Sequence, residues 1–152
     1  MIKKRNALLL ASLRENARIS LTELSKKLKI PISTLYERIK QNEKSLIKRY
    51  TAIVDFSQMG YPVKVELLLK VKNLQKERLK NFLMGCGQVN KLQKLNNNYD
   101  FIIEGFFKSI IEVDHFVESL ERDFPIVNRA IYYITEDLLN ERFLSNAASM
   151  KL

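Results

Sequence analysis

Several residue types that support catalysis or an extracellular fold are scarce in this chain. Its 152 residues include one cysteine, one histidine and four glycines. One cysteine forms no disulfide within the chain, so we expect a cytoplasmic protein rather than a disulfide-stabilised extracellular one. A single histidine without a cysteine or histidine cluster offers no zinc site. Because the glycines form no G-x-x-x-x-G-K loop, we expect neither a metal nor a nucleotide cofactor.

The lone cysteine and histidine do not indicate catalysis either. Cys86 lies between Gly85 and Gly87, in an expected helix-to-strand turn that favours a small packed side chain. A cysteine nucleophile needs a base, and only His115 is available for that role. His115 lies beside Asp114 within an expected helix, where a structural or surface role is the simpler interpretation. We therefore predict no catalytic residues and a protein that is not an enzyme.

Long hydrophobic runs are also missing. No apolar stretch approaches the roughly 20 residues that span a bilayer, so no membrane partner is expected. The opening sequence MIKKRNALLLASLREN is interrupted by charge and followed by no small-residue cleavage site, so no signal peptide is expected. With 46% hydrophobic residues, the chain can form a packed core in one ordinary domain or two small ones.

Acidic residues are scarce only in the first third of the chain. Residues 1–50 contain thirteen Lys or Arg, four Glu and no Asp, for a net charge of +9. Residues 51–152 contain thirteen basic and thirteen acidic residues, for a net charge of zero. This asymmetry indicates one segment that meets a polyanion and another with a different role. A solvated basic face is the alternative, because net charge does not determine fold.

Three helical patterns follow one another in the first fifty residues. The first covers about residues 4–16, and the second begins at Ser20, where Ser20 and Glu23 have the spacing of a capping box. Pro31 ends the second helix, because the residue before a proline is pushed away from helical geometry. The apolar stripes are Leu9, Leu10 and Leu13 in the first helix and Leu21, Leu24 and Leu28 in the second.

The third helix is expected over about residues 32–44. Thr34 and Glu37 offer a second capping-box pair, although Pro31 or Ser33 are alternative starting points. At 100° per residue, one side must face the core. That side carries Ile32, Leu35 and Ile39. Two short helices joined by a tight turn, with a helix packed behind them, form a helix-turn-helix whose second helix enters the major groove.

The opposite side of this third helix carries side chains suited to DNA. Gln pairs with adenine, Glu accepts from cytosine, and Ser or Thr contacts bases or phosphates, whereas Lys and Arg neutralise phosphates. The polar face of any surface helix is the alternative interpretation. The predicted DNA-binding residues are Ser20, Ser33, Thr34, Tyr36, Glu37, Arg38, Lys40, Gln41, Lys44, Lys48 and Arg49.

The remaining hundred residues predict a different fold. A β-prone segment over residues 46–55 and a turn over residues 56–62 come first. The pattern then indicates a strand at 64–72, a helix at 74–84, strands at 89–95 and 99–107, a helix opened by a Ser109–Glu112 capping box, and a strand at 126–135. This βαββαβ order is ferredoxin-like. Both helices should cover one face of the sheet, and the other face, which carries apolar side chains, favours a dimer.

The segment from Ala17 to Asp55 resembles the Lrp/AsnC family of regulators. The matching elements include Arg18-Ile19-Ser20, Ser33-Thr34-Leu35 and Arg38-Ile39-Lys40. The chain departs from the family in three places. The family usually has Asp at the position of Asn6, Ser-Pro at Pro31-Ile32, and a leucine at Asn42, where the chain is one residue short. The resemblance implies sequence-specific binding to double-stranded DNA.

The second half resembles the same family through its ligand-sensing RAM domain. In the family, a glycine-containing turn followed by Tyr-Asp joins the second and third strands, and amino-acid effectors bind near it, between dimers that assemble into octamers. The corresponding effector-binding residues here are Asn97, Asn98, Tyr99 and Asp100. The glycine is missing, with Asn97 in its approximate place. The resemblance thus implies self-association, and it leaves effector binding open.

Together these patterns predict an α+β protein with a helix-turn-helix (winged-helix-like) domain followed by a ferredoxin-like βαββαβ domain. The expected parts are a DNA-binding domain at 1–50, a linker strand and turn at 51–63, an effector-binding and oligomerisation domain at 64–137, and a tail at 138–152. For the tail, a helix packed on a neighbour and a frayed end both stay open. The alternative to an effector-modulated regulator is an architectural DNA-binding protein whose second domain only oligomerises.

Overall fold

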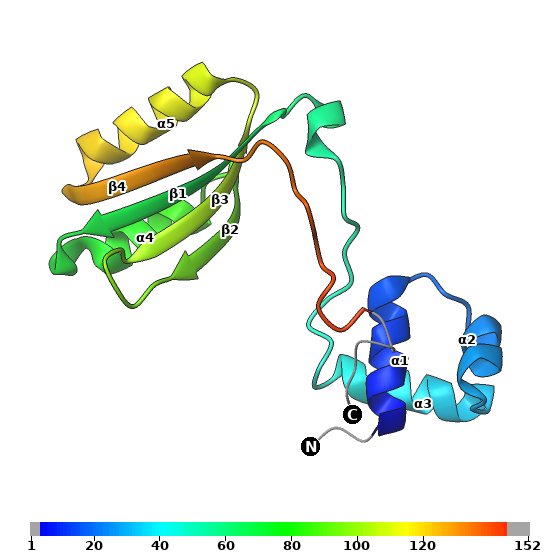
Figure 1. Cartoon of the computed structure of the whole chain (residues 1–152). Coiled ribbons are helices and arrows are strands. Elements are labelled where there is room, and N and C mark those ends of the chain that lie inside the picture. The colour runs from blue at the N-terminus through cyan, green and yellow to red at the C-terminus, as the bar shows by residue number, and fades with distance from the viewer. Residues whose placement is uncertain (1–3, 146–152) are drawn as a thin grey trace. The chain divides into compact units, whose positions relative to one another are not determined.

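The computed structural model describes residues 4–145, which divide into two compact units. The first unit contains the residues up to Ile53 together with the residues from Leu138 onward, and the second contains Val54–Asp137 (Figure 1). Between residues 4 and 145 no helix combines the length and the apolar character needed to cross a membrane.

Three helices form the first unit, as the sequence predicts. They are α1 (Lys4–Glu15), α2 (Leu21–Leu28) and α3 (Ile32–Glu43). One apolar cluster holds them together, because each helix contributes a leucine that is withdrawn completely from solvent. Its buried members are Leu9, Leu24, Ile30 and Leu35.

The start of α2 confirms the predicted capping box. The Ser20 hydroxyl accepts a hydrogen bond from the Glu23 N–H at 3.1 Å, and Glu23 Oε2 accepts one from the Ser20 N–H at 3.1 Å. Such a cap stabilises a helix by about 1 kcal/mol. The helix ends at Lys29, whose backbone is left-handed at φ 54° and turns the chain so that Ile30 enters the core. Both ends of α2 are thus set locally.

The start of α3 decides between the alternatives that the sequence leaves open. The helix begins at Ile32 with Pro31 as its N-cap, so the Pro31 start is confirmed, and the capping box of Thr34 and Glu37 is wrong. Ile32 was expected in the core, yet its side chain is 45% exposed. Ile30, which precedes the proline, fills the apolar site instead. The first two residues of α3, Ile32 and Ser33, are consequently exposed to solvent.

A pair of asparagine amides joins α1 to α3. Asn6 Nδ2 donates to Asn42 Oδ1 at 3.0 Å, and Asn42 Nδ2 donates to Asn6 Oδ1 at 2.8 Å. Asn42 is buried, with 4% of its surface exposed. Its backbone oxygen also accepts hydrogen bonds from the N–H groups of four residues after α3, namely Lys44, Ser45, Leu46 and Ile47. Two of the three departures from the Lrp/AsnC pattern therefore meet in space, and they fix how α3 lies on α1.

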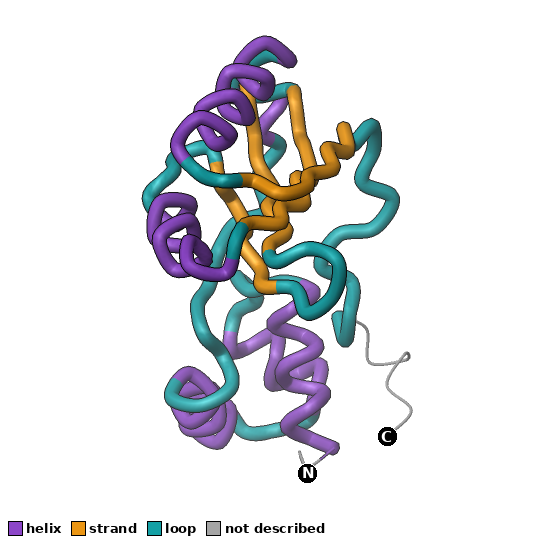
Figure 2. The backbone as a smooth tube through the Cα atoms, turned by 90° about the vertical axis from the view of Figure 1, so that its left-hand side faces the viewer, coloured by secondary structure: helices purple, strands orange, loops and turns teal. Residues whose placement is uncertain are grey.

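The second unit has the predicted βαββαβ order. Its elements are β1 (Val63–Val71), α4 (Lys76–Met84), β2 (Val89–Lys94), β3 (Phe101–Phe107), α5 (Ile110–Asp123) and β4 (Ile126–Tyr133), with short 3-10 turns η1 (Phe56–Met59) and η2 (Asn73–Gln75). The antiparallel strands lie in the order β2-β3-β1-β4. Both helices lie on the same side of the strands (Figure 2). The ferredoxin-like prediction is confirmed.

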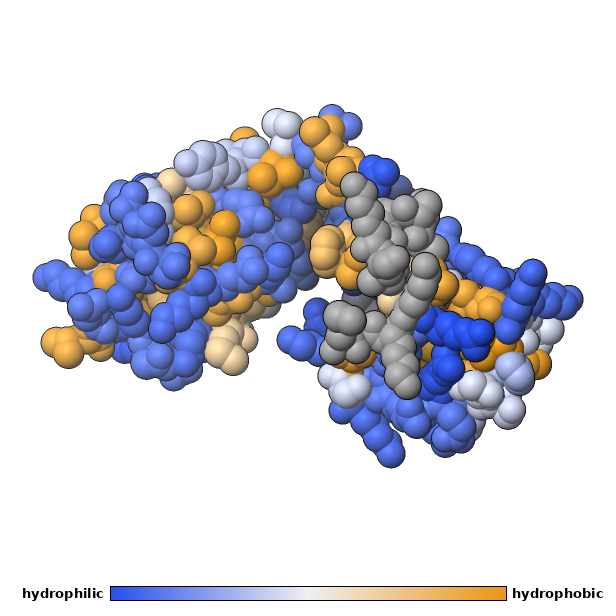
Figure 3. Space-filling view, turned by 60° about the horizontal axis from the view of Figure 1, so that its bottom comes forward, coloured by the Kyte–Doolittle hydropathy of each residue, from blue (hydrophilic) through white to orange (hydrophobic). Residues whose placement is uncertain are grey.

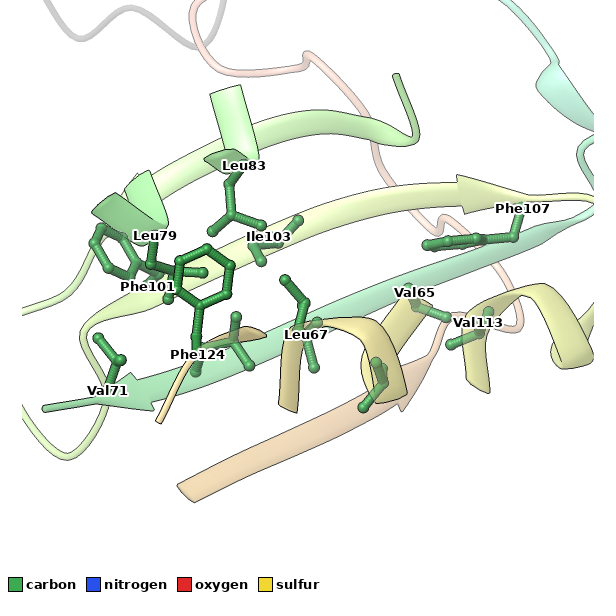
Figure 4. Close-up of a cluster of buried hydrophobic side chains, with 13 residues drawn as sticks. Val65, Leu67, Val71, Leu79, Leu83, Phe101, Ile103, Phe107, Val113 and Phe124 are labelled. Carbon is green, nitrogen blue, oxygen red and sulfur yellow. The ribbon is translucent and has the colours of Figure 1, made fainter. Parts of the chain in front are cut away.

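The core of this unit lies between the sheet and its two helices. Alternate side chains of β1 and β3 point toward α4 and α5, where they meet the inward residues of both helices (Figure 4). The buried cluster consists of Val65, Leu67, Leu69, Val71, Leu79, Leu83, Phe101, Ile103, Phe107, Val113, Val117, Leu120 and Phe124. The period-two pattern of the sequence thus identifies the buried face correctly.

The sheet face away from the helices is mixed rather than purely apolar. Leu68 pairs with Ile102 across β1 and β3, whereas Glu66 lies directly opposite Glu104. Lys64 offsets part of this negative charge, with its Nζ atom 3.1 Å from Glu104 and 2.8 Å from Asp137. Burial raises the pKa of the Glu66 carboxyl, and the negative charge of Glu104 raises it further. We call the set Leu68, Ile102, Glu66, Glu104 and Lys64 the open face.

The segment that connects the two units differs from the sequence prediction. The expected linker strand is absent, since residues 47–55 form no regular structure in the part of the chain described. A strand needs a neighbouring strand to receive its backbone hydrogen bonds, and residues 4–145 provide none here.

After Asp137 the chain returns to α1, where Arg14 donates to the carbonyl oxygens of Glu141 and Phe143 at 3.0 and 2.7 Å. The rest of the predicted tail, 146–152, lies outside the described residues.

A buried carboxylate joins β3 to β1 and α4. Asp100 Oδ2 accepts from the Val71 N–H at 3.0 Å, and Asp100 Oδ1 lies 2.6 Å from Lys76 Nζ. Burial acts to raise the pKa of this carboxyl, but the hydrogen bonds from Lys76 and Val71 and the charge of Lys76 outweigh it. The pKa of Asp100 therefore lies below its ordinary value.

We expect the two asparagines to be energetically coupled. Asn6→Leu or Asn42→Leu alone should lower the free energy of unfolding by about 1–3 kcal/mol, because each leaves a polar amide without its partner. The double variant should recover part of this loss, since replacing both partners by apolar groups can be nearly neutral. Urea unfolding followed by far-ultraviolet circular dichroism measures the free energy of unfolding of each variant. Asn98→Leu, at an exposed position, is the control. Strictly additive losses would contradict the coupling.

Asp100→Asn should destabilise the protein by about 1–3 kcal/mol at neutral pH, because a charge-assisted pair is lost. A folded-state pKa below the unfolded value of about 3.9 means that the stabilisation is complete above that value. It disappears as the pH falls through the folded-state pKa, so the wild type and the variant should converge in acid. Thermal unfolding between neutral and acid pH checks this, with exposed Asp114→Asn as control. A difference that stays constant into acid would contradict the assignment.

Candidate nucleic-acid interface and effector turn

The outward side of α3 carries most of the residues predicted to bind DNA. Leu35 is fully buried and Ile39 is packed against the same cluster, so the opposite side must face solvent. Two of the predicted residues, Thr34 and Arg38, are partly buried. The exposed ones on or just after the helix are Ser33, Tyr36, Glu37, Lys40, Gln41, Lys44, Lys48 and Arg49. The structure thus presents these side chains on one continuous stretch of chain.

Tyr36 and Lys40 form a pair on this surface. The Lys40 Nζ atom lies 4.5 Å from the centre of the Tyr36 ring, one helical turn earlier. Interaction with Tyr36 raises the pKa of Lys40, and the nearby carboxylates of Glu37 and Glu43 add to it. Lys40 therefore carries its charge at neutral pH, where it is available to a phosphate.

The chain leaving α3 places two more basic residues on the surface. The Asn42 carbonyl oxygen accepts hydrogen bonds from four backbone N–H groups, which closes a tight turn directly after the helix. Lys48 and Arg49 follow that turn and are exposed. Tyr50 donates its hydroxyl to Glu43 Oε1 at 3.1 Å and so ties this segment back to the end of α3. Sequence reasoning noticed Asn42 only as a departure, because its partner Asn6 lies 36 residues away.

Ser20 occupies a different position. It caps α2 rather than lying on α3, and its hydroxyl both accepts from the Glu23 N–H and lies 3.0 Å from Glu23 Oε2. An exposed helix N-terminus is suited to a phosphate, because unpaired N–H groups point outward there. A DNA contact by Ser20 stays a prediction.

The segment with the four predicted effector residues contains no residue with a positive φ. Asn97 and Asn98 are exposed, Tyr99 is partly buried and Asp100 is buried. Asn97 stands near the usual glycine position, yet its φ is not positive. Among residues 4–145, positive φ at non-glycine positions occurs only at Lys29, Glu141 and Leu144.

Asp100 is already engaged within the protein. Its carboxylate serves Val71 and Lys76, and its backbone oxygen accepts from the Leu95 N–H at 2.8 Å. The four predicted effector residues are adjacent in the chain, but the oxygen atoms of Asp100 already accept hydrogen bonds from other residues of the protein. Effector binding at this turn stays a prediction.

No metal site accompanies either surface. Within residues 4–145, no group of three or more His, Cys, Asp or Glu side chains lies close enough together to hold a metal ion. Cys86 is partly buried, which raises the pKa of its thiol, and it donates to the Phe82 carbonyl oxygen at 3.4 Å. This arrangement fits the packing role predicted for Cys86.

Known proteins resemble both units. A family model described as winged helix-turn-helix DNA-binding matches residues 7–41, which cover most of α1 to α3. The chain is 25% identical to the transcriptional regulator LrpC of Bacillus subtilis over 125 residues, 82% of this chain and 87% of LrpC. It is 27% identical to the transcriptional regulator FL11 of Pyrococcus furiosus over 109 residues, 71% of this chain and 72% of FL11.

Solved structures show the same fold. Bacillus subtilis LrpC has a TM-score of 0.82 at 22% identity, with 91% of this chain and 97% of LrpC covered. Escherichia coli AsnC has a TM-score of 0.81 at 18% identity, covering 92% and 96%. The Neisseria meningitidis regulator NMB0573, in complex with L-Met, has a TM-score of 0.85 at 17% identity, covering 92% and 94%.

These likenesses extend over both units and agree with the geometry described above. The helix-turn-helix match covers the helices that carry the basic surface, and the regulators that match in sequence do so over most of their length. The chain carries a DNA-binding helix-turn-helix, and over both units it is similar to transcriptional regulators of the Lrp/AsnC type.

Proposed function

We propose that the protein is a sequence-specific regulator that reads double-stranded DNA with the outward side of α3. The observation that carries this proposal is the one-sided burial of α3, with Leu35 at 0% exposure and the polar side chains opposite it in solvent. Gln41 and Glu37 are suited to base edges, whereas Lys40 and Lys44 are suited to phosphates. The net charge of +9 over residues 1–50 adds long-range attraction to DNA.

Self-association through the open face is part of this proposal. No helix covers the open face in the described chain, and Leu68 and Ile102 form an apolar pair on it. A second copy would remove this pair from water, and the Lys64–Glu104 ion pair would enter the interface already neutralised. A two-fold dimer would present two α3 helices to a palindromic site. Larger assemblies, including octamers, follow from family resemblance alone.

Modulation by an amino-acid effector is the less supported part. The NMB0573 structure contains L-Met, which favours an effector for a protein of this fold. The engaged Asp100 and the missing glycine at Asn97 favour the second candidate function, an architectural DNA-binding protein whose second unit only oligomerises. Both candidates share DNA binding, a cytoplasmic location and the absence of catalysis.

Removing a basic side chain at α3 should lower the affinity for all DNA, whereas removing a polar one should lower the preference for one sequence. Lys44→Ala should weaken binding to all duplexes and reduce the slope of log K against log salt by about 1, because one phosphate contact is lost. Gln41→Ala should instead weaken the preferred sequence by about 1–3 kcal/mol and relax the preference. Fluorescence anisotropy at several salt concentrations measures both. Exposed Lys72→Ala, in the second unit, is the control with the same change of charge. A Lys44→Ala variant that binds like the control would count against the interface.

A charge introduced at the centre of the open face should separate the copies. Leu68→Glu places a carboxylate beside Ile102, and burying it against a second copy would be unfavourable. Sedimentation velocity should then show a shift from dimer to monomer. Ile111→Glu makes the same chemical change at a 65% exposed position on α5 and should leave the dimer intact. A wild type that sediments as a monomer, or a Leu68→Glu variant that stays dimeric, would contradict the proposed interface.

A further inference from the structure

A cavity of about 940 Å³ lies within the second unit, where β3 ends and α5 begins. This volume is within the range of small-molecule sites in proteins. The turn at residues 97–100 precedes β3, so the cavity and the predicted effector turn lie at opposite ends of that strand. The lining residues come from η1, the start of β2, the end of β3 and α5.

One wall of the cavity is aromatic. The rings of Phe56 and Phe106 have their centres 4.5 Å apart, and Phe116 lies against the core residue Phe107 with its ring centre 5.5 Å away. Met59 joins this wall and is 61% exposed. Apolar residues also reach the surface in several other places (Figure 3). Here, however, they border a hollow, so an apolar group that enters it would remove several of them from water together.

Two nitrogen-bearing side chains, Lys108 and His115, also line the cavity. Lys108 Nζ lies 5.9 Å from the centre of the Tyr61 ring, and within residues 4–145 it forms no ion pair. His115 lies on α5 and also borders the cavity. Glu112 is the carboxylate of the rim, but its Oε2 atom accepts a hydrogen bond from the Lys108 N–H at 3.0 Å. The cavity thus combines an aromatic wall with an unpaired ammonium group.

We propose that this cavity binds a small carboxylate with an aromatic or bulky apolar body. The body would lie against Phe56, Phe106 and Met59, and the carboxylate would bind Lys108. A charge-assisted hydrogen bond to Lys108 supplies the polar anchor, and burial of the body supplies most of the affinity. This site is additional to the regulator's predicted effector turn.

The position of η1 gives such a ligand a physical effect. Phe56 and Met59 belong to η1, whereas Phe106 belongs to β3 and Lys108 directly follows that strand. A ligand between them joins two segments that are far apart in sequence. Along the chain, η1 directly follows residues 47–55, which lead from the DNA-binding unit. An occupied cavity therefore stabilises the end of that linker.

Calorimetric titration of the full chain with 3-phenylpropionate tests the proposal without DNA, so the result is independent of the regulatory function. We expect saturable binding to one site per chain, at least about tenfold weaker in Lys108→Gln, the effect of losing a charge-assisted hydrogen bond. Lys108 is exposed, and its backbone bond to Glu112 is retained in the variant. Phenethylamine, which has the same body but the opposite charge, should not bind.

Lys94→Gln provides the matched control, because Lys94 is an exposed lysine at the end of β2 next to the predicted effector turn. L-phenylalanine should be tested in the same way. If its binding is also weakened in Lys108→Gln, the site is supported, and an amino acid is indicated as the ligand that supplies the carboxylate. The proposal is overturned if 3-phenylpropionate does not bind. It is equally overturned if binding is lost in Lys94→Gln but kept in Lys108→Gln.

Discussion

Burial of one side of α3 is the constraint on which the DNA-binding unit depends. Leu35 and Asn42 lie two helical turns apart, so they share a side, and both are buried, at 0% and 4% exposure. Leu35 joins the leucines of α1 and α2, and Asn42 exchanges two hydrogen bonds with Asn6. With these contacts made, the helix has no rotational freedom, and the side that bears Gln41 and Lys44 faces outward.

The second unit uses its sheet in two ways. One face is filled by α4 and α5, which gives the unit its core, and the other is left without a helix. That second face mixes the Leu68–Ile102 pair with an ion pair between Lys64 and Glu104. Such a surface suits association of two copies, because Leu68 and Ile102 would leave water while Lys64 keeps its ion pair with Glu104. The cavity lies where β3 ends and α5 begins.

Patterns that depend on near neighbours could be predicted from the sequence, and patterns that depend on distant residues could not. The capping box of Ser20 and Glu23 and the alternation along β1 are local, and both are confirmed. Ile32 was assigned to the wrong environment, because its neighbour Ile30 reaches the apolar site first. The Asn6–Asn42 bonds and the cavity each unite residues from separate elements, for which a single sequence carries no periodic signal. The linker strand failed for a related reason, since residues 47–55 have no strand to pair with among the described residues.

Selection from a randomised pool of duplex DNA, repeated at two salt concentrations, tests most directly whether α3 reads sequence. The account predicts a recovered motif that is roughly palindromic, weaker binding at higher salt, and a base preference that Gln41→Ala relaxes at defined positions. Salt-dependent binding without any recovered motif would instead indicate the architectural function. No binding at either salt concentration would contradict the central claim that the outward side of α3 is a DNA-binding surface.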